Sequence, residues 1–485
     1  MKQLSDNQLL KTSSFIDGKW HKGTSTFEVL NPANNQLVAN VCDAGIVETA
    51  LAVRAAKKAL RLWSKKSAHD RAILLRRWFD LIMDNKNDLG RILTLEQGKP
   101  ITEAIGEITY GAAFIEWFAE EGKRIYGDTI AAPSNDKRIV VIKQPVGVVA
   151  AITPWNFPNA MIARKASAAL AAGCTFVVKP AALTPLSALA LAELATRAGI
   201  PHGVFNVVVG EDSVGMGKVL TQHPDVAKFT FTGSTFVGKK LLTQCATTVK
   251  KVSMELGGNA PFIVFDDADI DAAVEGAIVS KYRNAGQTCV CTNRILVQQS
   301  IAERFTQKFI KAVKKLTVGD GFIKGINVGP MISITAVEDV NQLVRLSVDL
   351  GAKVLVGGLS GQNDQGDNFY QPTILTNVTN DMPIASNEIF GPVAPIITFD
   401  SEEEAIALAN NTEYGLAAYF YARDIGRVWR VSEELDFGMI GINEGIISNV
   451  AAPFGGVKQS GNGREGSKYG LDDYLEIKYL CMGGL

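Results

Sequence analysis

Two cysteines, Cys289 and Cys291, stand in a short polar loop, Tyr282–Arg294, with the sequence YRNAGQTCVCTNR. An apolar segment with helical periodicity precedes the loop, and a strand-like run, RILVQ, follows it. A thiol in such a turn can meet a substrate. Most free cysteines are small inert apolar residues, so the pattern alone is weak, and this simple role is expected for Cys42, Cys174, Cys245 and Cys481.

Two other stretches supply groups that a cysteine-based oxidation of an aldehyde needs. Asn156 lies in TPWNFP, just before a helix expected from near Pro158, and its amide is a neutral donor suited to a developing alkoxide. An isolated asparagine there would more simply be a helix N-cap. Glu255 lies in MELGGNAP at the end of a strand, where a partly buried carboxylate can activate water. The simpler alternative is that Glu255 is only a salt-bridge partner.

The chemistry of Cys289 follows from what aldehyde oxidation requires. Attack by a thiolate makes the aldehyde carbon tetrahedral before it loses hydride, and the resulting thioester is easily hydrolysed. We expect local dipoles to favour the Cys289 thiolate and its backbone N–H to be a second oxyanion donor. We expect Cys291, two residues on in an extended segment, to point to the same side.

A phosphate-binding turn is indicated at FTGSTFVG (231–238), which follows a strand and opens a helix. Gly233 allows close backbone approach, Ser234 begins the helix, and Gly238 lets the helix pack on the sheet. The usual G-x-G-x-x-G is absent, so an ordinary serine-capped helix is about equally consistent with this pattern.

These strings, together with NEIFGPV (387–393), resemble the aldehyde dehydrogenase superfamily from about Phe15 to Leu485. The closing run PFGGVKQSGNGREGSKYG and the pair TCVC resemble succinate-semialdehyde dehydrogenases in particular. The resemblance implies NAD(P)-dependent oxidation of succinate semialdehyde to succinate, with Cys289 as nucleophile, Glu255 as base and Asn156 as oxyanion donor. Because CoA-acylating relatives generally lack this glutamate, it also implies release of the product by hydrolysis.

The resemblance assigns further residues to the cofactor. Lys179 corresponds to the lysine that holds the adenosine ribose, Glu388 to the carboxylate on the nicotinamide ribose and Phe390 to the ring that borders the nicotinamide; Trp155 joins this group. Many NAD-specific relatives have a glutamate at the position of Ala182, which would repel a 2′-phosphate. We therefore expect NADP to be accepted and preferred, with NAD as the alternative.

Two arginines are candidates for binding a substrate carboxylate. Arg283 lies six residues before Cys289, and Arg164 lies eight residues after Asn156, about two helical turns. Arginine binds carboxylates bidentately, although either residue alone would more simply form a surface salt bridge. By resemblance, Ser448 is a third contact. The expected substrate is a small aldehyde with a terminal carboxylate, and glutarate semialdehyde is the alternative to succinate semialdehyde.

Composition narrows the class of protein. The chain has 485 residues and 47% hydrophobic content, which favours two or three soluble domains. Its net charge of −1 favours neither nucleic acid nor an anionic membrane as a partner. No metal-ligand spacing is present, so a C-x-C metal site lacks companions. The N-terminus resembles neither a secretory signal nor a transit peptide, and a cytoplasmic location is expected. A non-enzymatic use of the fold is disfavoured by the set Cys289, Glu255 and Asn156.

Alternating strands and helices from Val146 predict an α/β fold, with a Rossmann-like cofactor domain followed by a second α/β catalytic domain. The expected limits are 1–122 and 146–256 for the NAD(P)-binding domain and 257–456 for the catalytic domain. By resemblance, 123–145 and 457–485 form a small β oligomerisation arm of a homodimer or homotetramer. A disulfide between Cys289 and Cys291 would be strained and easily reduced, so Cys291 is also a candidate redox switch.

Overall fold

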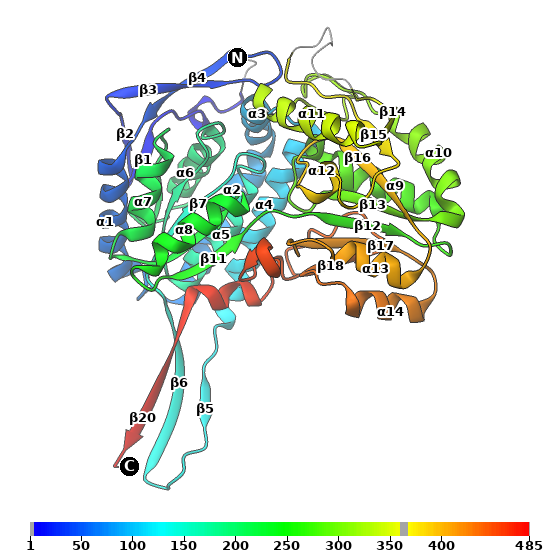
Figure 1. The fold of residues 1–485 in the computed structure, drawn as a ribbon. Coiled ribbons are helices and arrows are strands. Elements are labelled where there is room, and N and C mark those ends of the chain that lie inside the picture. The colour runs from blue at the N-terminus through cyan, green and yellow to red at the C-terminus, as the bar shows by residue number, and fades with distance from the viewer. Residues whose placement is uncertain (1–3, 359–366, 485) are drawn as a thin grey trace.

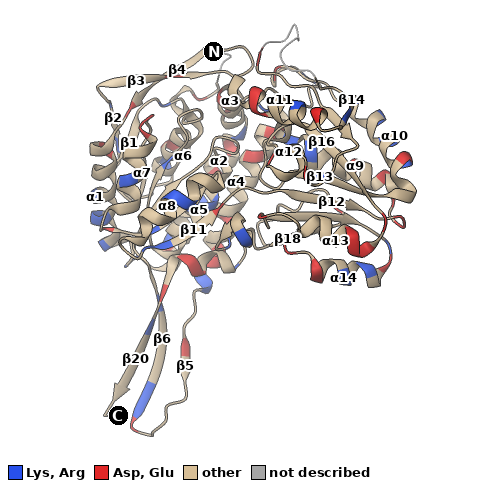
Figure 2. Cartoon of the chain, viewed as in Figure 1, with Lys and Arg blue, Asp and Glu red and all other residues tan. Residues whose placement is uncertain are grey.

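A computed structural model describes residues 4–358 and 367–484 of the chain. It has two α/β lobes and a long β arm that projects from the first lobe (Figure 1). The polar stretch Gly358–Asp367, whose sequence is typical of a surface loop, lies almost wholly outside the described residues. Lysines and arginines are mixed with aspartates and glutamates over both lobes in the view of Figure 2. No helix in the described part of the chain is long and apolar enough to cross a membrane.

The first lobe is built on an eight-stranded sheet in the order β19-β11-β10-β7-β8-β9-β1-β2. Its central strands β11, β10, β7, β8 and β9 are parallel, as the alternating strands and helices predict. The strands are β1 (Ser14–Ile16), β2 (Lys19–His21), β7 (Val148–Ile152), β8 (Thr175–Lys179), β9 (Phe205–Val207), β10 (Val226–Thr232), β11 (Lys251–Glu255) and β19 (Gly461–Asn462). The central strands are almost wholly buried, which explains their continuous apolar sequences.

Eight helices and a two-stranded sheet complete the first lobe. The helices are α1 (Ile46–Trp63), α2 (Ala68–Asp84), α3 (Lys86–Gln97), α4 (Ile101–Glu121), α5 (Ala160–Ala172), α6 (Leu186–Arg197), α7 (Ser213–Gln222) and α8 (Thr235–Ala246), and the small sheet pairs β3 (Ser25–Leu30) with β4 (Leu37–Asp43). Helix α5 is buried along its whole length against α4, and together they carry residues to the site described below.

The second lobe contains a seven-stranded sheet in the order β14-β15-β16-β13-β12-β17-β18. All neighbours are parallel except β14, which pairs antiparallel with β15. The strands are β12 (Ala260–Val264), β13 (Thr292–Gln298), β14 (Lys353–Val356), β15 (Thr373–Thr376), β16 (Val393–Phe399), β17 (Ala417–Tyr421) and β18 (Met439–Ile442). The helices are α9 (Ile270–Tyr282), α10 (Ala302–Val313), α11 (Ile334–Asp349), α12 (Pro383–Ser386), α13 (Glu402–Asn410) and α14 (Ile425–Glu434).

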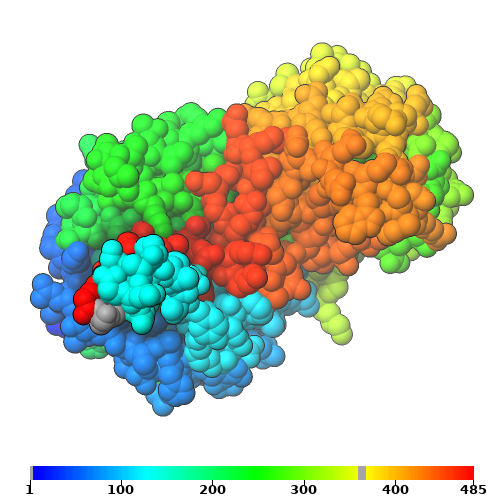
Figure 3. All heavy atoms as spheres, turned by 90° about the horizontal axis from the view of Figure 1, so that it is seen from below, coloured from blue at the N-terminus to red at the C-terminus, as the bar shows by residue number. Residues whose placement is uncertain are grey.

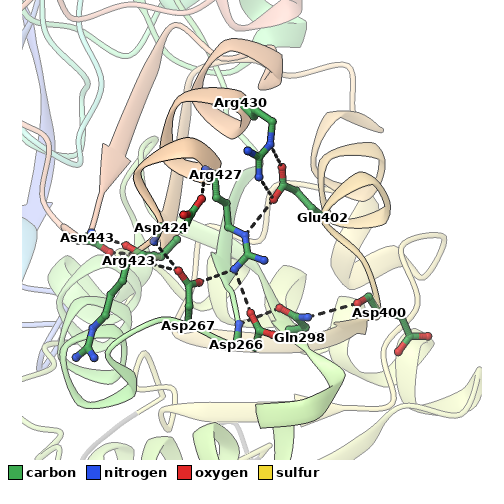
Figure 4. A network of polar contacts seen from close by, with 11 residues as sticks. Asp266, Asp267, Gln298, Asp400, Glu402, Arg423, Asp424, Arg427, Arg430 and Asn443 are labelled. Atoms are coloured by element: carbon green, nitrogen blue, oxygen red, sulfur yellow. Dashed lines mark hydrogen bonds and ion pairs between the residues drawn. The ribbon is translucent and has the colours of Figure 1, made fainter.

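A network of ion pairs joins helix α14 to the rest of the second lobe (Figure 4). Arg427 bonds Glu402 at the start of α13 and Asp266 and Asp267 after β12, at 3.0, 3.0 and 2.5 Å. Arg430 bonds both oxygens of the same Glu402, at 2.7 and 3.0 Å. Arg430 and Asp266 are exposed and the other members are partly buried; none of them lines the cavity described below, so the network holds helices of the second lobe together.

The arm is a three-stranded antiparallel sheet of β5 (Asp128–Ile130), β6 (Lys137–Pro145) and β20 (Leu475–Gly483) (Figure 1). This pairing of the hairpin with the C-terminal strand is the predicted one. The predicted boundary at 457 differs from the structure, because β19 continues the first sheet beside β11. Seen from below, the orange-red C-terminal segment runs between the two lobes (Figure 3), and only β20 belongs to the arm.

Candidate active site

Four of the predicted site residues follow adjacent parallel strands of the first sheet. Asn156 follows β7, Lys179 ends β8, Gly233 follows β10 and Glu255 ends β11. Because the carboxyl ends of parallel strands meet at one edge, the sheet itself gathers these side chains beside the second lobe. Cys289 comes from the second lobe, in the turn between α9 and β13.

Cys289 faces a cavity of about 330 Å³ between the lobes. The turn that carries it closes with a hydrogen bond from the N–H of Cys291 to the carbonyl of Thr288, at 2.9 Å. The Tyr419 hydroxyl donates to the carbonyl of Val290 at 2.8 Å and fixes the tip of the turn. Most of the cavity wall is apolar or aromatic. Its charged groups lie just before α4, on α4, on α5 and at the end of α9. The lining residues are Lys99, Glu103, Gly106, Glu107, Tyr110, Phe157, Met161, Arg164, Arg283, Thr288, Cys289, Val290, Ile446, Ser448 and Phe454.

The electrostatics of Cys289 differ from the sequence-based expectation. Burial raises the pKa of the Cys289 thiol to about 12, and the nearby charge of Arg164 lowers it only in part. Local dipoles therefore do not lower the pKa of this thiol, because removal of the sulfur from water outweighs them. Formation of the reactive thiolate requires a group that accepts the thiol proton.

Alkylation of Cys289 by iodoacetamide is expected to accelerate with pH across the whole range from neutral to pH 10 in the ligand-free protein. A raised pKa keeps the thiol protonated in this range, so each pH unit increases the thiolate fraction about tenfold. The rate should be followed by mass spectrometry of the Cys289 peptide, with the peptides of the other cysteines as internal controls. A plateau below pH 8 would contradict the raised pKa.

Cys291 does not point into the cavity, and the expected extended geometry is wrong. Its thiol donates to the carbonyl of Lys281 at 3.2 Å, and the side chain is buried between α9 and β13. The turn at Thr288–Cys291 rotates the two cysteines away from the same-side arrangement of an extended strand. Both cysteines are free thiols here. The redox switch stays a prediction, and it requires the Cys291 thiol to leave Lys281.

Asn156 lies in the loop between β7 and α5, and it is not the helix N-cap, a position taken by Asn159. One amide hydrogen of its Nδ2 is donated to the carbonyl of Gln287 at 3.0 Å. A primary amide has two N–H donors, so Nδ2 keeps a second donor; Asn156 itself is not one of the residues that line the cavity at Cys289. Its backbone carbonyl accepts from Lys99 Nζ at 2.8 Å. Lys99 thus fixes the backbone of this loop, and one N–H of Asn156 Nδ2 is left without a partner among the described residues.

Glu255 is 2% exposed, and neither of its carboxylate oxygens has a hydrogen-bond partner among the described residues. Burial raises its pKa well above the ordinary value, and Glu465 raises it further, while Arg164 and Lys165 oppose the shift. This does not match the simple salt-bridge alternative. A buried carboxyl of raised pKa is suited to accept a proton near neutral pH.

Glu465 is a buried carboxylate that the sequence analysis did not single out. It pairs with both Arg164 and Lys165. Burial alone would raise the pKa of Glu465, but these two cations outweigh burial and hold the pKa below its ordinary value. The negative charge of Glu465 raises the pKa of Glu255, so the pKa values of these two carboxyl groups in one buried cluster are shifted in opposite directions.

Both predicted substrate arginines line the cavity. Arg283 has no ion pair or hydrogen bond to its guanidinium in the described part of the chain; its guanidinium carbon lies 5.7 Å from the centre of the Phe157 ring. Arg164 is 1% exposed, pairs with Glu465 and stacks over Phe454 at 4.2 Å. Ser448 also lines the cavity. Arg283 is thus the cation with the larger unused capacity to bind an anion.

Helix α4 contributes cavity residues that the sequence analysis did not single out. Glu103, Glu107 and Tyr110 recur at spacings of four and three, which places them on one helix face. Glu107 accepts from Lys99 at 2.7 Å and from the N–H groups of Asn159 and Ala160 at 3.0 and 3.2 Å. Two carboxylates on one face in the apolar N-terminal half of the helix were the available signal, since buried charges require partners.

The predicted phosphate-binding turn lies between β10 and α8. Ser234 is the N-cap of α8 and accepts from the N–H of Val237 at 3.4 Å, so the serine cap and the free helix N-terminus are both present. A Cβ on Gly238 would lie 2.4 Å from the Leu256 side chain, which is why the helix packs closely on the sheet only with glycine. The first N–H groups of a twelve-residue helix fit a phosphate.

Lys179 and Ala182 border the same edge of the sheet. Lys179 is 3% exposed, and its ammonium makes a single long bond, 3.5 Å to the carbonyl of Pro180. Burial lowers its pKa to about 8, against the opposite effect of Asp212 and Asp43. A buried ammonium with unused donors fits the hydroxyl or phosphate groups of a ribose. Ala182 is half-buried and brings no charge to this edge.

A second cluster lies where the EIFGPV segment meets the first lobe. Glu388 accepts from the N–H of Gly258 at 3.1 Å through one oxygen, and burial raises its pKa to about 7. Phe390, with φ of +50°, packs edge-to-face on Trp155 with ring centres 5.5 Å apart. A carboxylate oxygen beside two aromatic rings fits a nicotinamide riboside, so the residues present fit the dinucleotide that the resemblance implies.

No group of three or more histidine, cysteine, aspartate or glutamate side chains within residues 4–358 and 367–484 could hold a metal ion.

Three curated relatives match the chain over its whole length. The 3-sulfolactaldehyde dehydrogenase of Pseudomonas putida is 58% identical and covers 100% of both chains. The succinate-semialdehyde dehydrogenase [NADP(+)] GabD of Escherichia coli is 56% identical over 99% of this chain and 100% of its own. The glutarate-semialdehyde dehydrogenase of Pseudomonas aeruginosa is 57% identical and covers 100% of both.

The fold is that of a solved E. coli NADP-dependent enzyme, with a TM-score of 0.98 and 56% identity over 99% of this chain and 100% of that one. The model of the aldehyde dehydrogenase family matches residues 20–480. A family match of this extent, together with relatives of such identity, identifies the chain as a member of the aldehyde dehydrogenase family, whose enzymes are oxidoreductases that use NAD(P).

Proposed function

We propose that this enzyme oxidises succinate semialdehyde to succinate with NADP, through a thiohemiacetal and a thioester on Cys289. The observation that supports the substrate is the cavity at Cys289, whose wall carries Arg283 with an unpaired guanidinium and Arg164. A semialdehyde places its carbonyl and its carboxylate at opposite ends, so the thiol and the arginines can bind both at once.

The proposed reaction begins when the thiolate of Cys289 attacks the aldehyde carbon. The free N–H of Asn156 Nδ2 and the backbone N–H of Cys289 donate to the alkoxide that forms. Bound NAD(P) supplies the hydride acceptor. Lys179 and the α8 N-terminus would hold its adenosine end, and Glu388, Phe390 and Trp155 would hold its nicotinamide end.

Glu255 completes the cycle by taking a proton from the water that attacks the thioester. Its buried carboxyl has a raised pKa, so its basicity exceeds that of an ordinary glutamate. Release of the acid regenerates the Cys289 thiol. The set Cys289, Glu255 and Asn156 supports hydrolysis of the thioester over transfer to CoA.

Replacing Arg283 with alanine is expected to lower kcat/KM for succinate semialdehyde by roughly a hundredfold, about 2–3 kcal/mol, because a charged hydrogen bond to the carboxylate is lost. Butanal has the same carbon count and no carboxylate, so its kcat/KM should stay within about threefold. Steady-state reduction of NADP with both aldehydes gives the two ratios.

The same assay tests the proposed substrate in the unmodified enzyme. Succinate semialdehyde should exceed butanal by about a hundredfold in kcat/KM. Equal values would overturn the anchoring role of the arginines and leave a general aldehyde dehydrogenase.

Glutarate semialdehyde is the second candidate, because one relative is named for it. One extra methylene is worth only about 1–3 kcal/mol in discrimination, and the same arginines would bind its carboxylate. A relative named for 3-sulfolactaldehyde acts on an aldehyde with a sulfonate, which is also a terminal anion. A comparison of kcat/KM for the three anionic aldehydes ranks them.

Introducing glutamate at Ala182 is expected to shift the ratio of kcat/KM for NADP over NAD toward NAD by about tenfold or more, because a carboxylate would repel the 2′-phosphate. The alanine brings no negative charge to the edge that carries Lys179, and the E. coli relative named for NADP supports the preference. Ala182→Gln is the uncharged control of equal size. An unchanged ratio in Ala182→Glu would contradict the placement.

The arm supports a homodimer or homotetramer. Its strand β20 exposes apolar side chains, including Ile477 at 72% and Tyr479 at 61% exposure. Such a strand in water requires a cover, and a second copy of the chain is the proposed one.

A further inference from the structure

A buried side-chain amide joins the loop of Asn156 to the loop of Cys289. Asn284, which is 2% exposed, donates from Nδ2 to the carbonyl of Asn156 at 3.0 Å and to the carbonyl of Gln287 at 3.1 Å. Asn156 donates from its own Nδ2 to the same Gln287 carbonyl at 3.0 Å. Asn284 therefore bonds both the backbone of the oxyanion-donor residue and the carbonyl that orients its side chain.

A second amide decides which way Asn284 faces. Gln97 is fully buried at the end of α3 and donates from Nε2 to Oδ1 of Asn284 at 3.0 Å. The Oε1 of Gln97 accepts from the N–H of Lys99 at 3.0 Å, so its own orientation is fixed. Because Oδ1 of Asn284 is occupied by Gln97, its Nδ2 is the end that faces the two carbonyls.

The backbone at Asn284 has a left-handed conformation, and the hydrogen bonds of the Asn284 side chain help to hold it. Asn284 and Ala285 have φ of +52° and +55°, and Gly286 follows with +75°. Asparagine tolerates this left-handed region, whereas alanine rarely adopts it. The turn is held by a bond from the Asn284 N–H to Glu103 Oε2 at 2.9 Å. Strain of this kind persists only where the surroundings fix the conformation, and it is common at active sites.

We propose that Asn284, oriented by Gln97, is a positioning residue that sets Asn156 Nδ2 against the reacting oxygen at Cys289. The inference rests on the proposed role of Asn156 as an oxyanion donor. An oxyanion donor acts only at hydrogen-bond distance from the developing charge, and a displacement of about 1 Å costs up to about a hundredfold in rate. The role of Asn284 is thus to fix the position of the loop that carries Asn156 relative to the loop that carries Cys289.

Asn284→Ala is expected to lower kcat by about 10- to 100-fold with KM for the aldehyde changed less than threefold. Gln97→Glu removes the Nε2 donor and places an acceptor against Oδ1, which should turn the Asn284 amide and give a loss of similar size from outside the cavity. Asn206→Ala is the matched control, because Asn206 is a fully buried amide with three hydrogen bonds in the first sheet. Its kcat should not change.

The decisive measurement is a double-mutant cycle with Asn156→Ala. If Asn284 acts through Asn156, Asn284→Ala should change kcat less than twofold in the Asn156→Ala background, while alkylation of Cys289 by iodoacetamide keeps its rate in every variant. Additive losses, or alkylation rates that fall with kcat, would overturn the positioning role and leave the oxyanion role of Asn156 intact. A fully active Asn156→Ala enzyme would instead overturn the oxyanion role, and the inference with it.

If Asn284→Ala does not fold, Gln97→Glu is carried through the same cycle with the same criteria.

Discussion

Cys289→Ser is expected to lower turnover of succinate semialdehyde by a factor on the order of 10⁴ or more, because a serine hydroxyl is a far weaker nucleophile than a thiolate at neutral pH. The change replaces one atom, so the cavity and its arginines should keep their places. The measurement is steady-state reduction of NADP at saturating aldehyde.

The matched control for this prediction is Cys291→Ser, two residues along the same turn. Cys291 is buried against the carbonyl of Lys281 and does not line the cavity, so its loss should leave turnover within about threefold. Equal losses in the two variants would mean that the turn has collapsed, and a fully active Cys289→Ser would exclude Cys289 as the nucleophile.

Glu255→Gln is expected to separate the two halves of the reaction. The amide has the size of the carboxyl group but accepts no proton, so thioester hydrolysis should slow by about 10²- to 10³-fold. Formation of the thioester should continue. Stopped-flow measurement should therefore show a burst of about one reduced nicotinamide per site, followed by slow turnover.

The kcat of the unmodified enzyme should depend on the protonation state of Glu255. Burial and Glu465 raise the pKa of Glu255, so in the unmodified enzyme the base form and kcat should both increase as pH rises through that pKa. The increase should disappear in Glu255→Gln. Glu96→Gln is the matched control, because burial raises the pKa of Glu96 to about 8 away from the cavity. Absence of the burst in Glu255→Gln would mean that Glu255 acts in a step that precedes thioester formation.

Much of this architecture could be predicted from local sequence. The parallel strands of the first sheet are continuous apolar runs, and these runs predicted the sheet. Asn156, Gly233 and Glu255 were predicted from short motifs at strand ends and Lys179 from the family resemblance; in the structure all four follow or end adjacent parallel strands. Strands β15 and β18, of four residues each, lie beside longer strands of the second sheet and are hard to recognise from sequence. Short runs of this kind acquire their structure from neighbouring strands.

The site was less predictable where tertiary contacts decide the outcome. The turn at Thr288–Cys291 depends on bonds to Tyr419 and Lys281, which lie far along the chain or on another element, so Cys291 was given the wrong direction. The raised pKa of Cys289 depends on burial between two lobes, which a loop sequence does not show. Glu465 and the polar face of α4 reach the site only through tertiary packing against α5.

The most direct test of the account is mass spectrometry of the Glu255→Gln enzyme, quenched with acid after one burst of succinate semialdehyde and NADP. We expect a succinyl thioester on the peptide that contains Cys289, in about one copy per chain, and much less butyryl adduct when butanal is supplied at the same concentration. An adduct absent from Cys289, or succinyl and butyryl adducts formed equally well, would contradict a Cys289 nucleophile served by an arginine-bound carboxylate.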